Sequence, residues 1–257
     1  MTRHVVSVVV LWAVLTAIGE VFAFADLYPP VASVEAEDFD NIFRTLLIMG
    51  MPVFTFALAM IGYSFFVFSH RGKPTEDGPP QKGTGMVPII WLGVTGALAI
   101  TVMIFPGLTG LANLQKDHTG YGWGDNDAEL VINVTAFRFG WELEYPENGG
   151  FKLNSATSGF VELPVDSKVR FNVNSSDVVH SFWIPAFRMK IDTLPGRTTF
   201  FTVDITDTGE YDQDSAFRIQ CAELCGQDHT FMRFPLKVVE KADFDQWVAE
   251  QQAGGGN

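Results

Sequence analysis

Residues 221–232 read CAELCGQDHTFM and hold both cysteines of the chain, followed by a histidine and a methionine. Cys221, Cys225, His229 and Met232 thus bring four potential metal-binding side chains into one short segment. Thiolate and thioether sulfur with imidazole nitrogen suit copper or zinc far better than calcium or magnesium. A structural zinc site usually takes four Cys/His ligands from two separated pairs, and this segment offers only three. A disulfide between the two cysteines is the simpler alternative, and at this point it stays open.

A further strong ligand is expected outside this segment. Of the remaining histidines, His4 and His70 lie at the ends of apolar runs and His118 lies in a loop rich in Gly and Asp. His180 differs, because it falls within SSDVVHSFWIP, an apolar run where burial is expected. A mononuclear blue-copper site uses one cysteine, so a second thiolate points to two metal ions that share bridging sulfurs. We therefore expect His180 to join the segment as a ligand.

Three long apolar runs precede this part of the chain. Thr45–Ser69 and Gly83–Leu114 contain no charged residue, and both exceed the roughly 20 residues that a helix needs to cross a membrane. Val5–Phe24 is ambiguous: residues 1–25 are typical either of a cleaved signal peptide or of an additional transmembrane helix. Residues 26–114 are predicted to form a transmembrane helical hairpin with a cytoplasmic loop.

The charges beside these runs predict the orientation in the membrane. Arg71, Lys73 and Lys82 lie between the second and third runs, whereas acidic residues crowd the segment between the first two. Basic loops stay in the cytoplasm. We expect a multi-pass protein of the plasma (inner) membrane whose C-terminal half lies on the extracytoplasmic side.

The C-terminal half has the pattern of an acidic, soluble β-domain. Residues 115–257 hold 22 of the 30 acidic and 12 of the 17 basic side chains, which argues against nucleic acid and for a basic partner, or simply for a well-solvated surface. Short β-rich runs separated by turn residues predict an all-β sandwich or barrel over residues 115–241. Residues 242–257 are expected to form a C-terminal helix and a Gly-rich tail. The predicted strands are Glu129–Phe139, Trp141–Tyr145, Gly159–Leu163, Lys168–Asn174, Thr198–Asp204, Phe217–Cys221 and Phe234–Val239.

These motifs resemble subunit II of the haem–copper respiratory oxidases, specifically cytochrome c oxidase with its dinuclear copper A centre. Residues 221–232 match that family's Cys-x-Glu-x-Cys-x-x-x-His-x-x-Met pattern at every defined position, including Glu223. The stretch DVVHSFWIP and the later Lys190-x-Asp192-x-x-Pro195-Gly196-Arg197 resemble its second block. The resemblance implies transmembrane helices followed by an extracytoplasmic, cupredoxin-like Greek-key β-sandwich.

The resemblance also implies a role for each candidate ligand. Cys221 and Cys225 would bridge two copper ions, and His180 and His229 would each bind one of them. Met232 and the backbone carbonyl of Glu223 would be weak ligands, and the Glu223 side chain would face a magnesium ion at the interface with subunit I. Electrons would pass from a basic cytochrome c or a small copper protein to subunit I, where oxygen is reduced to water and protons are translocated.

The sequence departs from the family pattern where electrons enter. AFRFGWELEYP keeps Trp141 and Tyr145 of the family's aromatic block, but Phe139 stands in place of the entry tryptophan. These three residues are the candidates for electron entry. The carboxylate that the family uses for proton uptake aligns loosely with Gln81, and Glu76 is a possible substitute.

Two further inferences concern partners and alternative functions. Glu142, Glu144, Glu147 and Asp177 lie close in sequence to Trp141 or His180 and are expected to form an acidic docking surface for the donor. The chain lacks a Cys-x-x-Cys-His haem site. A quinol oxidase subunit would lack the ligands, and nitrous oxide reductase would need a longer, His-rich chain. A membrane-anchored copper-delivery protein is the alternative from a different functional class.

Overall fold

The computed structural model describes residues 2–25, 28–69, 83, 85–112, 119–121 and 127–254. The chain divides into two compact units, one formed by Met1–Leu27 and Asn41–Gly110 and the other by Tyr28–Asp40 and Leu111–Asn257. Residues 28–40, which the sequence places in the membrane hairpin, are therefore part of the C-terminal unit. The following residues named above lie outside the described part: His70, Arg71, Lys73, Glu76, Gln81, Lys82 and His118.

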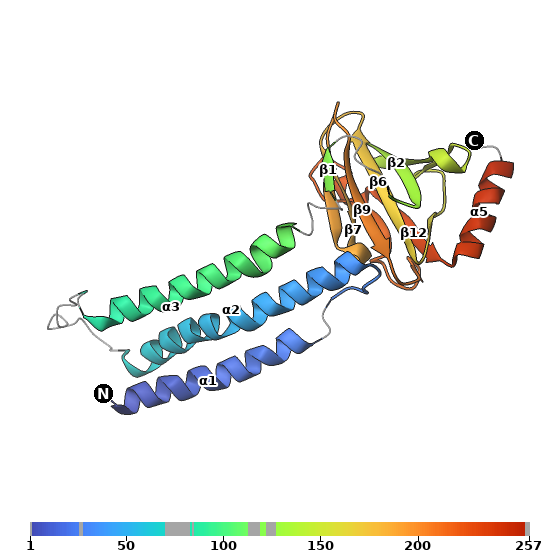
Figure 1. The fold of residues 1–257 in the computed structure, drawn as a ribbon. Helices are drawn as coiled ribbons and strands as arrows, with labels where there is room; N and C mark the ends of the chain where they lie inside the picture. The colour runs from blue at the N-terminus through green and yellow to red at the C-terminus, as the bar shows by residue number, and fades with distance from the viewer. Residues whose placement is uncertain are drawn as a thin grey trace. The chain divides into compact units, whose positions relative to one another are not determined.

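The N-terminal unit consists of helices that are long and apolar enough to cross a membrane. Helix α1 spans Thr2–Phe24, α2 spans Val34–Val67 and α3 spans Met86–Val102 (Figure 1). Helix α3 is followed by η1 (Met103–Leu108), a π-helical segment that is kinked at Phe105, where the backbone angles are not helical. The apolar side chains of these helices are largely exposed, as expected of surfaces that face lipid. The chain is thus membrane-anchored, and α2 begins well before the apolar run that predicted it.

Helix α1 packs on α2 through specific polar contacts. The Trp12 indole donates a hydrogen bond of 2.8 Å to the Pro52 carbonyl, and the hydroxyls of Thr16 and Thr55 are 2.7 Å apart. Gly19 makes room for Met51, whose sulfur would lie 2.5 Å from a Cβ at that position. Hydrogen bonds between helices are favoured in a bilayer, where water cannot replace them. We propose on these contacts that α1 is a third membrane helix that stays with the chain.

The C-terminal unit is a β-sandwich whose two sheets supply the two faces of one core. Its first sheet has the strand order β1–β9–β6–β2–β3–β4, and its second has β10–β12–β11–β7–β8, with β5 parallel to β12. The strands of the first sheet are β1 (Thr119–Tyr121), β9 (Thr199–Ile205), β6 (Ser167–Ser175), β2 (Leu130–Phe137), β3 (Gly140–Tyr145) and β4 (Phe151–Asn154). Those of the second are β10 (Gly209–Glu210), β12 (Arg233–Val239), β11 (Arg218–Cys221), β7 (His180–Ile184), β8 (Met189–Thr193) and β5 (Val161–Pro164).

Short helical turns and one helix complete this unit. Turns η2 (Pro146–Asn148) and η3 (Pro185–Phe187) follow β3 and β7, and η4 (His229–Phe231) lies within the 221–232 loop. Helix α5 (Lys241–Ala253) lies beside the sandwich (Figure 1). Its Phe244 and Val248 side chains are buried in the core. The predicted β-sandwich and C-terminal helix are confirmed.

The predicted strands agree with the observed ones within a few residues, but β1, β4, β7, β8 and β10 were not predicted. In β7, four of the five residues are buried, so its two faces do not differ in polarity and the alternation that marks a half-exposed strand is missing. Strands β4 and β10 are too short to show a period.

An aromatic cluster joins the two sheets. Phe171 of β6 and Phe201 of β9 lie 5.2 Å and 5.8 Å, centroid to centroid, from Phe182 of β7. The Trp141 indole of β3 packs edge-on against Phe182 at 5.4 Å. Such contacts between large buried rings fix β7, the strand that begins at His180, against the first sheet.

Candidate metal centre

Strand pairing brings His180 and Cys221 together although they are 41 residues apart in sequence. His180 begins β7 and Cys221 ends the neighbouring β11, where Cys221 is the register partner of Phe182. Both side chains are buried, with 0% and 2% of their surfaces exposed. These two candidate ligands are thus held by regular sheet structure rather than by a loop alone.

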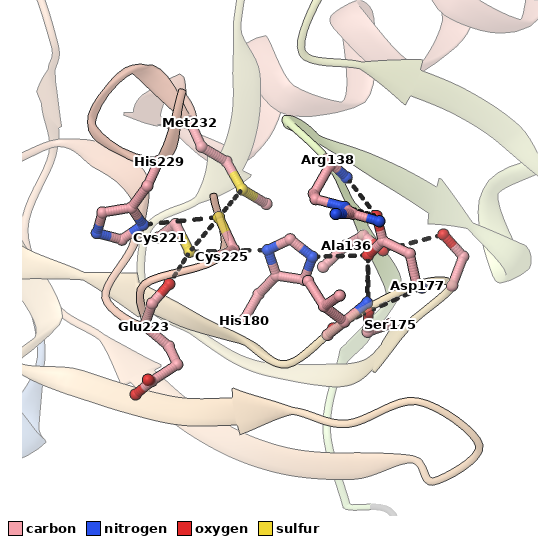
Figure 2. Close-up of polar contacts among 12 residues, drawn as sticks. Ala136, Arg138, Ser175, Asp177, His180, Cys221, Glu223, Cys225, His229 and Met232 are labelled. Carbon is pink, nitrogen blue, oxygen red and sulfur yellow. Dashed lines mark hydrogen bonds and ion pairs between the residues drawn. The ribbon is translucent and has the colours of Figure 1, made fainter. Parts of the chain in front are cut away.

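Backbone hydrogen bonds hold the remaining candidates in a compact loop between β11 and β12. The Cys221 amide donates to the Met232 carbonyl, which closes the loop at its base. The His229 amide donates to the Gly226 carbonyl, and the Met232 amide donates to the His229 carbonyl across η4. This folding turns Cys225, His229 and Met232 toward Cys221 (Figure 2).

The six candidate ligands form two groups around the pair of cysteine sulfurs. Cys221 Sγ lies 3.8 Å from His180 Nδ1 and 3.2 Å from the Glu223 carbonyl oxygen. Cys225 Sγ lies 3.6 Å from His229 Nδ1 and 3.8 Å from Met232 Sδ. The two sulfurs are 3.9 Å apart. Each sulfur therefore has one imidazole nitrogen and one weak donor beside it (Figure 2).

Both cysteines are free thiols. Their sulfurs are nearly twice as far apart as the roughly 2.05 Å of a disulfide bond, so the structure does not contain the disulfide alternative. Burial and the neighbouring Cys221 together raise the pKa of the Cys225 thiol to about 12. A buried thiol with a raised pKa needs a nearby cation to become a thiolate, and soft copper ions fit a donor set of two sulfurs and two imidazoles.

His180 is oriented from behind by Asp177. Its Nε2 lies 2.8 Å from the Asp177 carboxylate, and its Nδ1 faces Cys221 (Figure 2). Burial alone would raise the pKa of Asp177, but hydrogen bonds from His180, the Val178 amide and both the amide and the guanidinium of Arg138 hold that pKa well below its usual value. A carboxylate behind a ligating imidazole fixes its ring orientation and its tautomer.

Phe139 packs directly on the cysteine loop. Gly226 has a φ of +143°, a conformation that favours glycine, and a Cβ at this position would lie 2.9 Å from the Phe139 ring. Of the three entry candidates, Phe139 is thus the aromatic that lies against the loop.

We expect Gly226→Ala to lower the free energy of unfolding by about 2–4 kcal/mol, since it combines backbone strain with a clash against the Phe139 ring. Gly196→Ala is the matched control, because Gly196 also has a positive φ but no atom within 4 Å of its Cβ position. It should cost about 1–2 kcal/mol from backbone strain alone. Thermal unfolding of the two variants measures the difference, and equal losses would contradict the Phe139 contact.

The other two entry candidates lie inside the sandwich. Trp141 is a fully buried core residue, and its ring centroid lies 6.3 Å from that of His180. Tyr145, also fully buried, stacks on Phe151 at 4.7 Å and donates to the Glu162 carbonyl. The structure therefore brings Trp141 to the candidate centre and places Tyr145 in the core near α5.

Most of the acidic residues expected to form the docking surface are engaged in other contacts. Asp177 is bound by His180 and Arg138, Glu142 pairs with Lys152 at 2.9 Å, and Glu144 accepts from Asn133. Glu147 is exposed on η2. Asp177 thus faces a ligand rather than solvent alone, a role that the three-residue spacing Asp177-x-x-His180 could have suggested. The Arg138 contact gave no signal in the sequence.

The backbone carbonyl and the side chain of Glu223 point in different directions. The carbonyl faces Cys221, whereas the exposed carboxylate points away from the sulfurs (Figure 2).

Comparison with known proteins places these features in one family. Residues 130–240 match the family model described as cytochrome c oxidase subunit II, periplasmic domain. Cytochrome c oxidase subunit 2 of Alkalihalophilus pseudofirmus is 32% identical over 218 residues, which cover 84% of this chain and 58% of that protein. The subunit 2 of Synechocystis sp. is 27% identical over 261 residues, covering 87% of this chain and 75% of its own length.

One solved structure is also similar in sequence to part of the chain. The periplasmic domain of subunit II of cytochrome oxidase from Bradyrhizobium japonicum is 33% identical and covers 50% of this chain and 97% of that domain, with a TM-score of 0.45. The chain spans little more than half the length of the Alkalihalophilus relative. The family model, the relatives and the cysteine loop agree, and the chain belongs to the cytochrome c oxidase subunit II family.

Proposed function

We propose that this chain is the electron-accepting subunit of a terminal cytochrome c oxidase of the plasma (inner) membrane. It would take electrons at a dinuclear copper centre and pass them to a haem–copper subunit I, where oxygen is reduced and protons are translocated. The observation that carries the proposal is the pair of free, buried sulfurs 3.9 Å apart, each with its own imidazole nitrogen nearby.

The donor set fits two copper ions. Cys221 and Cys225 would bridge the ions, His180 and His229 would each bind one, and Met232 and the Glu223 carbonyl would be the weak ligands. When bound, the copper pair supplies a redox centre that takes up and releases one electron. The exposed Glu223 carboxylate is available for a magnesium ion at the interface with subunit I.

The protein's own residues would limit the rearrangement that accompanies electron transfer. The sheet pair β7–β11 holds His180 and Cys221, and the hydrogen bond between the Cys221 amide and the Met232 carbonyl closes the loop. Asp177 keeps Nε2 of His180 engaged, so that Nδ1 stays directed at the metal. Residues whose own positions are locked in this way keep a site in one geometry.

The donor is proposed to be a basic cytochrome c or a small copper protein that docks near Phe139. The contact of Phe139 with the loop supports this location, and the buried Trp141 beside His180 would act behind the surface. Glu142, Glu144 and Glu147 remain the proposed acidic contacts, whereas Asp177 is engaged within the site.

The test is electron paramagnetic resonance of the full chain, purified in detergent and loaded with copper. We expect about two copper ions per chain and hyperfine splitting from one unpaired electron shared between them, because two thiolates can bridge both ions. A single-copper spectrum, or a Cys221–Cys225 disulfide in the freshly purified, copper-loaded protein, would contradict the proposal.

A membrane-anchored copper-delivery protein is the competing function. A carrier must release its metal, whereas the candidate ligands His180, Cys221, Cys225 and Met232 are all buried. Retention of copper against a competing chelator under native conditions therefore favours the oxidase subunit, and rapid loss favours the carrier.

A further inference from the structure

Arg188 binds the beginning of helix α2 to the β-sandwich of the C-terminal unit. Because this sandwich carries the candidate copper ligands, it is called the copper domain below. Its Nε and Nη2 donate to the two carboxylate oxygens of Asp40 at 3.0 and 2.9 Å, which makes a bidentate ion pair. Nη1 also donates to the carbonyls of Pro30 and Pro185, and Nη2 donates to the carbonyl of Pro29. A guanidinium has five N–H donors, so these five contacts use its full capacity.

The Arg188–Asp40 pair is buried rather than a loose surface contact. The two side chains are only 9% and 11% exposed. Breaking a buried pair leaves an uncompensated charge, which distinguishes it from exposed pairs that contribute little. Arg188 also has a φ of +56°, a conformation that is unfavourable for any residue other than glycine. The side chain must therefore offset the strain of its own backbone.

Further contacts make residues 28–40 part of the same domain. Ala32 donates its amide to the Ala186 carbonyl and accepts from the Thr206 amide. Ser33 forms a bridge with Ile205, the last residue of β9, and its hydroxyl accepts from the Ala36 amide, which caps the start of α2. The first turns of α2 are thus fixed to the copper domain before the helix enters its apolar stretch.

Arg188 is also closely linked to the candidate copper ligands. It follows η3 (Pro185–Phe187), which follows β7, and β7 begins with His180. The Arg188 guanidinium therefore links the first residues of α2, which belong to the C-terminal unit, to the segment that follows the strand of His180. Within the described residues, the side-chain hydrogen bonds of Arg188 go to Asp40, Pro29, Pro30 and Pro185 and to no candidate copper ligand. Substitution of Arg188 or Asp40 therefore leaves the donor set itself intact.

We propose that Arg188 and Asp40 form a positioning clamp that holds the copper domain at the start of helix α2 and thereby sets the rate at which electrons leave the copper centre for subunit I. This inference rests on the proposed function. Electron transfer between fixed centres falls steeply with distance, whereas copper binding depends only on the local donors. The clamp should therefore affect the outward transfer and leave copper binding unchanged.

The test uses the assembled oxidase with Arg188→Gln, Asp40→Asn or both substitutions in this subunit. Flash photoreduction of the copper centre, followed by its reoxidation by the haem of subunit I, measures the outward transfer. We expect each single variant to slow this step several-fold, because the rate of electron transfer falls steeply as the distance between the two centres grows. The double variant should be no slower than the slower single one, because both substitutions break one unit.

Two controls separate positioning from general stability. Lys241→Gln removes a charge from an exposed pair with Asp245 and should leave the outward rate unchanged. Arg188→Lys keeps the positive charge but cannot form the bidentate contact with Asp40, so an intermediate outward rate is expected. Copper content, the copper spectrum and the rate of copper reduction by a small-molecule donor should match the parent in every variant.

Three results decide the outcome. An unchanged outward rate in Arg188→Gln and Asp40→Asn would overturn the clamp. Loss of copper or of assembly in both variants, but not in Lys241→Gln, would overturn it as well, since the pair would then serve the folding of the domain. If the parent oxidase itself shows no transfer from the copper centre to the haem, the proposed function fails rather than the clamp.

Discussion

Replacing Cys225 by serine is expected to abolish the dinuclear centre and leave at most one copper ion per chain. Cys225 Sγ is the atom within 4 Å of Cys221 Sγ, His229 Nδ1 and Met232 Sδ, so it connects both groups of ligands. A serine hydroxyl has nearly the same shape but is a harder donor that does not ionise readily, so it cannot replace a bridging thiolate. Copper analysis and electron paramagnetic resonance of the full chain measure the loss.

Met232→Leu is the matched control for this substitution. The thioether is proposed to be a weak ligand, and leucine fills a similar volume in a fully buried position. This variant should keep about two copper ions with an altered reduction potential, as expected for a weak axial ligand. If Met232→Leu loses copper as completely as Cys225→Ser, the assignment of bridging and weak ligands is wrong.

The second large effect is expected at Asp177. Asp177→Asn replaces a carboxylate that accepts from His180, from the Val178 amide and from Arg138. An amide cannot accept all of these hydrogen bonds, so the His180 ring loses its fixed orientation. Substitution of the partner behind a ligating histidine typically lowers metal affinity by about 10- to 100-fold. We expect a loss of this size in a chelator competition assay.

Glu147→Gln removes the same charge from an exposed position on η2 and is the control. It should leave copper affinity unchanged. Equal changes in the two variants would mean that Asp177 acts through the overall charge of the domain rather than through His180. An unchanged affinity in Asp177→Asn would remove the orienting role altogether.

The candidate ligands could be identified from the sequence because their side chains carry distinctive chemistry. Cys221, Cys225, His229 and Met232 lie in one segment, and His180 was the remaining histidine in a buried run. The structure brings all of them together with the Glu223 carbonyl. Local spacing was sufficient here because a short loop limits how far its side chains can separate.

Contacts between distant segments could not be predicted in the same way. The pairing of β7 with β11, which brings His180 to Cys221, depends on a strand whose burial on both faces hides its period. Asp177 looked like a surface charge until its partners Arg138 and His180 were located. Tyr145 was a candidate by its position in a motif, and its side chain belongs to the core. In each case the information lies in tertiary pairing rather than in the local pattern.

The position of residues 28–40 within the copper domain has a consequence for the order of biosynthesis. Ala32, Ser33 and Asp40 leave the ribosome before helices α2 and α3 are complete, whereas their partners Ala186, Arg188 and Ile205 are made roughly 150 residues later. Chains are synthesised from the N-terminus, so an early segment waits for a late one. The C-terminal unit therefore closes around its first residues only after both helices have been made, and the candidate metal site is complete only from that moment.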